Sequence, residues 1–131
     1  MRDTMGLLRT TIAIENGFRP GIKHELPETL VDTGAELTWV PRTVLEELGI
    51  KPRKQVRFEM ANGMEIARDI GFAIVHAGGT ETIDEVVFGE PGDLVLLGAR
   101  SLQGLNLKVD LVGKRLVAGG PMLAASELIA A

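Results

Sequence analysis

Short stretches of alternating apolar and polar residues make up most of the chain, and most of them end at a glycine, proline or asparagine. Residues 105–112 show the pattern best, because Leu105, Leu107, Val109 and Leu111 point one way and the residues between them point the other. This period of two is typical of a half-buried β-strand. Similar runs predict further strands over residues 7–15, 29–31, 37–40, 55–61, 64–67, 70–76, 82–88, 94–97 and 115–118.

Turns and helices separate these strands. Asn62-Gly63 predicts a hairpin with a type I′ turn, in which both central residues have positive φ, and Gly78-Gly79 predicts another tight turn. Residues 43–48 have apolar positions at helical spacing, and Gly49 is placed to end that helix. Residues 99–103 predict a second short helix that ends at Gly104. The glycines and proline of residues 16–24 predict a loop.

Eight or nine short strands with one or two short helices predict a mainly β protein, either a barrel or a sandwich. At 131 residues the chain suits a single domain, with a core over about residues 7–118 and a tail over 119–131. A weak internal repeat is also visible. Leu30–Gly34 followed by a helix is echoed by Leu94–Gly98 followed by a helix, which suggests two related halves.

Composition excludes several classes of function. The 14 Lys and Arg against 18 Asp and Glu give a net charge of -4, which disfavours a nucleic-acid partner. The absence of cysteine excludes disulfides, cysteine-based zinc sites and thiol catalysis. The two histidines have no ligand partners at metal spacing, so no metal is expected. With no signal-peptide pattern and no apolar run near the roughly 20 residues of a membrane span, we expect a cytoplasmic protein without a membrane partner.

Asp32-Thr33-Gly34 is the tripeptide with the most chemical potential. It follows an apolar strand, so the carboxylate emerges from buried surface, and Gly34 allows another backbone or a ligand to approach closely. Taken alone, the tripeptide is most simply an Asx-turn that closes a strand.

Three features together resemble the retropepsin-like aspartic proteases, the one-lobe relatives of the retroviral enzymes. They are residues 29–35 with Thr38-Trp39-Val40-Pro41, the hairpin at Asn62-Gly63, and Leu96-Leu97-Gly98 before a short helix. The resemblance spans about residues 7–117. It implies a closed retropepsin-like barrel and an aspartic endopeptidase that acts on peptide or protein substrates without a cofactor.

The resemblance also implies a homodimer. Two carboxylates about 3 Å apart cannot both ionise, so they share a proton, and one can then act as base to a water while the other acts as acid. The chain has only one Asp-Thr-Gly and carries Leu97-Gly98 where a two-lobe enzyme would place its other aspartate. The second carboxylate is therefore expected from Asp32 of another copy across a two-fold axis.

Further roles follow from the resemblance alone. Active-site support is expected from Thr33, Gly34 and Gly98. Substrate contacts are expected from Ala35, Trp39 and Leu96 as pocket walls and from Ala61, Asn62, Gly63 and Met64 as the tip of a flap. The family pattern also suggests an ion pair between Arg100 and Glu36, although Arg100 lies one place later than in retroviral members.

Plainer interpretations stand beside these roles. Trp39 and Leu96 also suit an ordinary core, and Asn62-Gly63 also suits a simple turn. The same fold could serve as a non-catalytic dimerisation or peptide-binding module. An unrelated small β-barrel, with Asp32 exposed at a turn, is a further alternative.

Overall fold

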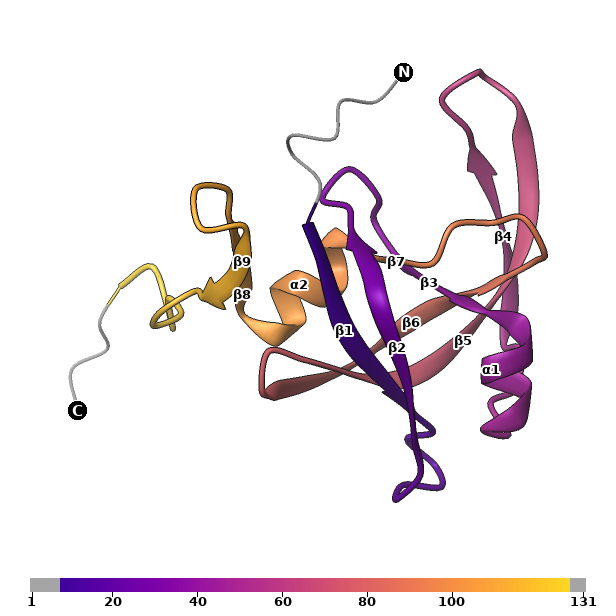
Figure 1. Ribbon diagram of the computed structural model, residues 1–131, viewed down its shortest axis with the longest axis horizontal. Coiled ribbons are helices and arrows are strands. Elements are labelled where there is room, and N and C mark those ends of the chain that lie inside the picture. The colour runs from indigo at the N-terminus through magenta and orange to yellow at the C-terminus, as the bar shows by residue number, and fades with distance from the viewer. Residues whose placement is uncertain (1–7, 128–131) are drawn as a thin grey trace.

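The computed structural model describes residues 8–127, so residue 7 of the predicted core and residues 128–131 of the predicted tail lie outside the described part (Figure 1). The described residues form nine strands and two short helices, which confirms the mainly β class. In chain order the elements are β1 Leu8–Glu15, β2 Lys23–Val31, β3 Thr38–Pro41, α1 Arg42–Glu47, β4 Lys54–Glu59, β5 Glu65–Ala77, β6 Thr80–Gly89, β7 Leu96–Leu97, α2 Ala99–Leu105, β8 Leu107–Asp110 and β9 Arg115–Ala118. Residues 119–127 carry neither helix nor strand.

Seven of the strands form one sheet in the order β1-β2-β7-β3-β6-β5-β4. β1 also pairs with β5, through Ala13 opposite His76 and Glu15 opposite Ile74, so six strands close into a ring in the order β1-β2-β7-β3-β6-β5. β4 lies outside this ring and, among the described strands, pairs only with β5. Two pairings are parallel, β2 with β7 and β3 with β6. A separate two-stranded sheet, β8-β9, follows α2.

β2 is much longer than the apolar run at residues 29–31 predicts. Its first half, from Lys23, falls within the segment 16–24 predicted as a loop and the polar residues after it. This half alternates exposed and half-buried positions and pairs with β1 from Glu15 opposite Lys23 onward. Backbone pairing with a neighbour, rather than apolar content, therefore makes this segment a strand.

Of the two hairpin turns that the sequence predicts, one differs in the structure and one is confirmed. At the β4–β5 hairpin only Gly63 has positive φ, +84°, so the type I′ turn predicted for Asn62-Gly63 is wrong. Met60 N–H bonds to Met64 O at 2.7 Å and Gly63 N–H to Met60 O at 2.8 Å, a three-residue connection that needs one left-handed residue. The β5–β6 hairpin does have positive φ at both Gly78 and Gly79, which confirms the tight turn there.

Both predicted helices are present. α1 begins at Arg42 and buries Val44 and Leu45, and Gly49 just beyond it has φ +75°, as its role in ending the helix requires. α2 passes through Gly104 instead of ending there. A Cβ at position 104 would collide with Thr82, so this glycine is required by close packing on β6, and Asn106 with φ +54° ends the helix.

The interior of the closed ring is filled by apolar side chains from most strands and from both helices. Phe88, Ile12, Ile14, Leu45 and Leu97 are among the largest that are fully buried. A smaller apolar cluster lies beside β4, where Val56 and Phe58 pack against buried Leu37, Ile70 and Val87. Neither helix in the described stretch has the length and apolarity needed to cross a bilayer.

Candidate active site

The parallel pairing of β2 with β7 fixes the position of Asp32. Leu30 lies opposite Leu96 and Val31 opposite Leu97, and Asp32 N–H donates a 2.9 Å hydrogen bond to Leu97 O. The two segments of the internal repeat therefore run side by side, and Asp32 emerges half-buried where β2 ends.

The turn after β2 is tightly bonded to the Asp32 side chain. Gly34 N–H donates to Asp32 Oδ1 at 2.9 Å, and Ala35 N–H donates to Asp32 O at 3.2 Å. This is the Asx-turn that the tripeptide predicts on its own. The bond from Gly34 fixes one carboxylate oxygen relative to the loop.

α2 holds the other half of this loop. Ala99 N–H donates to Ala35 O at 2.8 Å and Arg100 N–H to Glu36 O at 2.9 Å. The approach leaves no room for a side chain at Gly98, because a Cβ there would collide with the carbonyl group of Leu37. Gly98 is thus the close-contact point between the two repeat segments, which explains a glycine at this position.

Buried hydroxyls reinforce the same junction. Gly98 N–H donates to Thr38 Oγ1 at 3.0 Å, Thr38 donates to Ser101 Oγ at 2.6 Å, and Ser101 Oγ donates to Asp84 Oδ2 at 3.0 Å. Sequence reasoning assigned no role to Thr38 or Ser101. One feature of the sequence could have indicated a role for Thr38: its hydroxyl lies between two apolar residues at the start of a strand that faces the interior.

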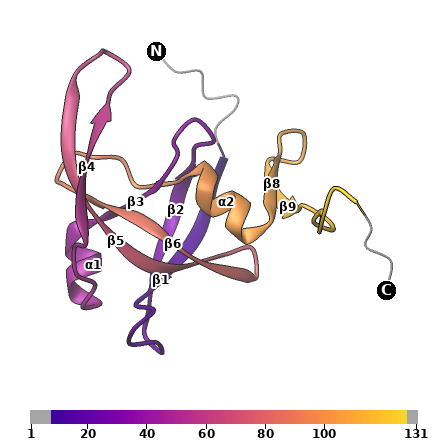
Figure 2. The ribbon, with the colours of Figure 1, turned by 180° about the vertical axis from the view of Figure 1, so that it is seen from behind.

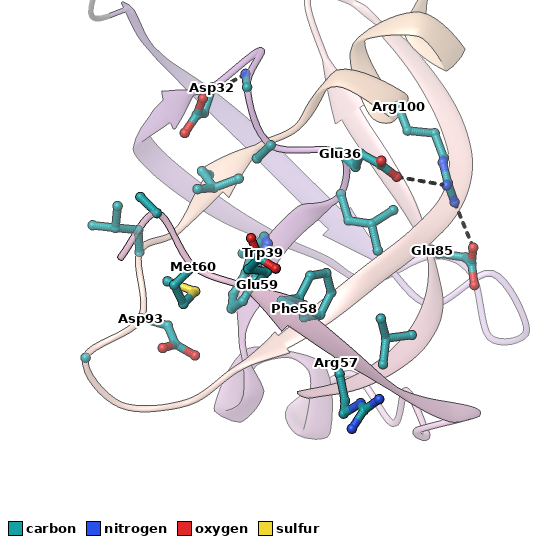
Figure 3. A pocket seen from close by; sticks show the side chains of 18 of the residues that line it. Asp32, Glu36, Trp39, Arg57, Phe58, Glu59, Met60, Glu85, Asp93 and Arg100 are labelled. Carbon is teal, nitrogen blue, oxygen red and sulfur yellow. Dashed lines mark hydrogen bonds and ion pairs between the residues drawn. The ribbon is translucent and has the colours of Figure 1, made fainter. Parts of the chain in front are cut away.

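Asp32 borders a groove of about 830 Å³ (Figure 3). The loop after β2 supplies one side, β4 and the tip of the β4–β5 hairpin another, and the segment between β6 and β7 a third. In Figures 1 and 2 the hairpin stands clear of the barrel at the same end as the β2–β3 loop. An open groove of this size between a fixed loop and a projecting hairpin can accept an extended chain.

The groove gathers about half of the residues predicted for the site. Those that line it are Asp32, Gly34, Ala35, Trp39, Ala61 and Leu96. Those that do not are Thr33, Asn62, Gly63, Met64 and Gly98. Thr33 is exposed and Gly98 is buried. The Asn62 side chain accepts a 3.0 Å bond from Met64 N–H, so it closes the hairpin turn instead of facing the groove.

One wall of the groove is aromatic and aliphatic. The rings of Trp39 and Phe58 lie 5.1 Å apart between centroids with an interplanar angle of 53°. Val56 and Leu37 continue this wall. Phe58 and Val56 were not predicted as site residues, although their alternation with polar neighbours in β4 marks one face of that strand.

A cluster of charged side chains also lines the groove, and Arg100 lies at its centre. The ion pair suggested between Arg100 and Glu36 is present at 3.7 Å, but Glu85 lies nearer to Arg100, at 2.8 Å. Lys54 also contacts Glu85, at 2.5 Å. The hydrogen bond from Lys54, supported by Arg100, lowers the pKa of the Glu85 carboxyl. Glu85 therefore remains an anion at neutral pH and below.

Asp93 is a second groove carboxylate that is held ionised. Arg68 donates two hydrogen bonds to the Asp93 carboxylate, from Nε to Oδ2 at 2.7 Å and from Nη2 to Oδ1 at 2.9 Å. The bonds from Arg68 lower the pKa of Asp93. This pair also ties the segment between β6 and β7 to the β4–β5 hairpin. Within residues 8–127, no group of three or more His, Asp or Glu side chains is arranged to hold a metal ion.

Solved structures similar to this chain include two foamy virus proteins. The solution structure of the simian foamy virus (mac) protease is 23% identical over 72% of this chain and 92% of that one, with a TM-score of 0.48. The foamy viral protease-reverse transcriptase in complex with an RNA/DNA hybrid is 17% identical over 72% of this chain and 12% of that one, with a TM-score of 0.49. No curated protein matches the chain.

A family model also matches the sequence. The model of the gag-polyprotein putative aspartyl protease family matches residues 22–104, which include the Asp32 loop, the β4–β5 hairpin and the Gly98 junction. The match covers well over half of the chain, and the chain therefore belongs to this aspartyl protease family.

Proposed function

We propose that the protein is a homodimeric aspartic endopeptidase that hydrolyses peptide bonds with a water activated by two Asp32 carboxylates, one from each subunit. The observation that carries the proposal is the position of Asp32. Its carboxylate is fixed by Gly34 N–H at the edge of an open groove, in a chain of the aspartyl protease family.

The internal pairing of the chain supports a second carboxylate from another copy. Asp32 and Gly98 follow directly on the paired ends of β2 and β7, and the adjacent residues of the second repeat segment, Leu96-Leu97-Gly98, include no carboxylate. Four other carboxylates line the groove, Glu36, Glu59, Glu85 and Asp93, and the last two form ion pairs that lower their pKa values. Neither of these two is suited to share a proton with Asp32, whereas a two-fold axis would bring an identical residue to it.

The paired carboxylates would work as a unit. Their mutual repulsion at short range keeps one protonated while the other is ionised, as in aspartic proteases generally. The ionised carboxylate removes a proton from water as the water attacks the peptide carbonyl carbon, and the protonated carboxyl donates to the carbonyl oxygen. Collapse of the tetrahedral intermediate then breaks the C–N bond, and a proton passes to the leaving amine.

The groove fits an extended, partly apolar peptide. Trp39, Phe58 and Leu96 offer apolar surface to side chains, and the β4–β5 hairpin can close over the chain as a flap. Ala35 and Ala61 allow a peptide backbone to come close on either side. Thr33, exposed beside Asp32, is proposed to bond across the dimer axis, and Gly98 to support the loop from beneath.

Digestion of a peptide library by wild type and by Asp32→Asn, combined with sedimentation of both, tests the proposal. We expect wild type to cleave and to sediment as a dimer, and Asp32→Asn to keep fold and dimer while losing cleavage. Glu47→Gln, which removes one exposed carboxylate from α1, is the matched control and should cleave as wild type does.

Two results would count against the proposal in different ways. Cleavage by Asp32→Asn at the wild-type rate would refute the mechanism, and cleavage by a strictly monomeric protein would refute the pairing. Saturable peptide binding by wild type, with no product at any pH, would instead identify a non-catalytic peptide-binding module on the same fold.

A further inference from the structure

A second cavity lies at the end of the molecule away from the Asp32 loop. It has a volume of about 330 Å³ and lies between the β1–β2 loop, the segment after α1 and Phe72 of β5. Figures 1 and 2 both show the β1–β2 loop and α1 at the lower end, with the β2–β3 loop and the tip of the β4–β5 hairpin at the upper end. The cavity shares no lining residue with the groove.

The charge of this cavity is one-sided. Arg19, Lys51 and Arg53 line it, and no acidic residue does. Within residues 8–127, none of these three cations has a carboxylate within ion-pair distance, whereas Arg42, Arg68 and Arg100 are all paired. The chain as a whole carries a net charge of -4. The cavity, with three cations and no acidic residue, is therefore positively charged on a negatively charged protein.

Hydrogen bonds hold the backbone segments around the cavity in place without a ligand. Asn16 is buried and ties its two sides together, because its amide donates to Leu48 O at 2.9 Å while its Oδ1 accepts from Phe18 N–H at 2.8 Å. Arg53 N–H donates to Ile70 O at 2.7 Å, and the Arg53 guanidinium lies over the Phe72 ring at 5.3 Å. Such anchoring limits the entropy lost when the cations engage a partner.

Apolar surface adjoins the cations. Phe18 lines the cavity with 75% of its surface exposed, and Ile22, in the same loop, is 73% exposed. The cavity thus combines positive charge with an exposed aromatic ring. This combination suits a partner with both carboxylates and an apolar side chain.

We infer that this cavity is a docking site for an acidic peptide segment that carries an apolar residue among its carboxylates. Charge complementarity selects acidic side chains, and the exposed Phe18 selects an apolar neighbour. A nucleic acid fits less well, because three cations on an acidic chain give little of the phosphate attraction on which such binding depends. The site requires neither Asp32 nor a second subunit, so it stands or falls independently of the proposed peptidase activity.

The test measures binding of a short fluorescein-labelled peptide, with glutamates flanking one phenylalanine, by fluorescence anisotropy to the full chain carrying Asp32→Asn. We expect saturable binding that weakens as salt increases. Adding Lys51→Glu and Arg53→Glu should weaken it by about tenfold or more, since two attractive charges become repulsive. Replacing the glutamates of the probe with glutamines should weaken binding similarly.

Matched controls separate the site from overall charge. Lys108→Glu with Lys114→Glu makes the same charge change on the exposed β8–β9 hairpin and should leave the affinity within about twofold of the parent. Equal loss in both double variants would overturn the proposal, because the attraction would then be non-specific. Tighter binding of a single-stranded oligonucleotide or of inorganic phosphate at the same residues would also overturn it, by assigning the site to phosphate.

Discussion

The hydroxyl of Thr38 donates a 2.6 Å hydrogen bond to the hydroxyl of Ser101, and both side chains are fully buried. Through this bond β3 is joined to α2, 63 residues later in the chain. The same Thr38 oxygen accepts from Gly98 N–H, at the point where the two repeat segments meet. A buried polar contact therefore helps to hold the loop that carries Asp32 in position.

Replacing Thr38 with valine should destabilise the protein. Thr38→Val keeps the shape of the side chain but leaves Gly98 N–H buried without an acceptor, which costs roughly 1–3 kcal/mol. Urea unfolding should show a lower midpoint. Thr43→Val, the same change at an exposed position of α1, should alter stability by less than about 0.5 kcal/mol. Equal midpoints for both variants would show that the buried bond contributes nothing measurable.

Two glycine variants should separate stability from activity. Gly98→Ala places a Cβ against the Leu37 carbonyl, and relief of that clash should cost about 1–3 kcal/mol. At Gly34 a Cβ would lie 3.2 Å from Asp32 Oδ1, so Gly34→Ala should disturb the carboxylate more than the fold. Thermal unfolding and peptide cleavage, measured on both, check this. A more stable Gly98→Ala than Gly34→Ala would contradict it.

Local signals were sufficient for much of the fold. The helical spacing before Gly49, the paired glycines at positions 78 and 79 and the turn at Asp32 depend on conformational preferences of neighbouring residues, and each is present. Such preferences act within a few residues, so they can be recognised without knowing what the segment will contact.

Long-range contacts explain why the predicted loop end at residue 24 and the predicted helix end at Gly104 were wrong. Lys23 and the polar residues after it become a strand only because β1 lies alongside, and Gly104 stays helical because α2 packs closely on Thr82. The charged wall of the groove has the same origin. Lys54 and Glu85 come from different strands, and the sequence around neither residue predicts that they contact each other.

Trp39 should report directly on the groove. It is the only tryptophan, and its ring lies against Phe58 of the β4–β5 hairpin. Phe58→Ala removes that contact and admits water to Trp39, so the emission maximum should shift to longer wavelength and stability should fall by roughly 1–2 kcal/mol. Phe18→Ala, at the far end of the molecule, should leave the emission unchanged. An unshifted spectrum in Phe58→Ala would place the hairpin away from Trp39 in solution.

The Arg68–Asp93 pair should make stability depend on pH in the acid range. Because Arg68 lowers the pKa of Asp93 in the folded state, the pair stabilises the protein fully above the ordinary aspartate value of about 3.9, and that stabilisation disappears as the pH falls through the lowered value. Arg68→Gln should therefore cost roughly 1–3 kcal/mol at neutral pH, where the bidentate contact is intact.

The difference in free energy of unfolding between Arg68→Gln and wild type should become smaller as the pH falls below about 4. Asp93 is then increasingly protonated in both proteins, so the ion pair contributes less. Urea unfolding at a series of pH values measures it. Arg57→Gln is the control on the neighbouring strand, because Arg57 pairs with Glu65 at 3.7 Å with both side chains exposed, and it should change stability by less than about 0.5 kcal/mol throughout. If the stability difference instead stays constant from neutral to strongly acid pH, Arg68 does not act through the Asp93 carboxylate.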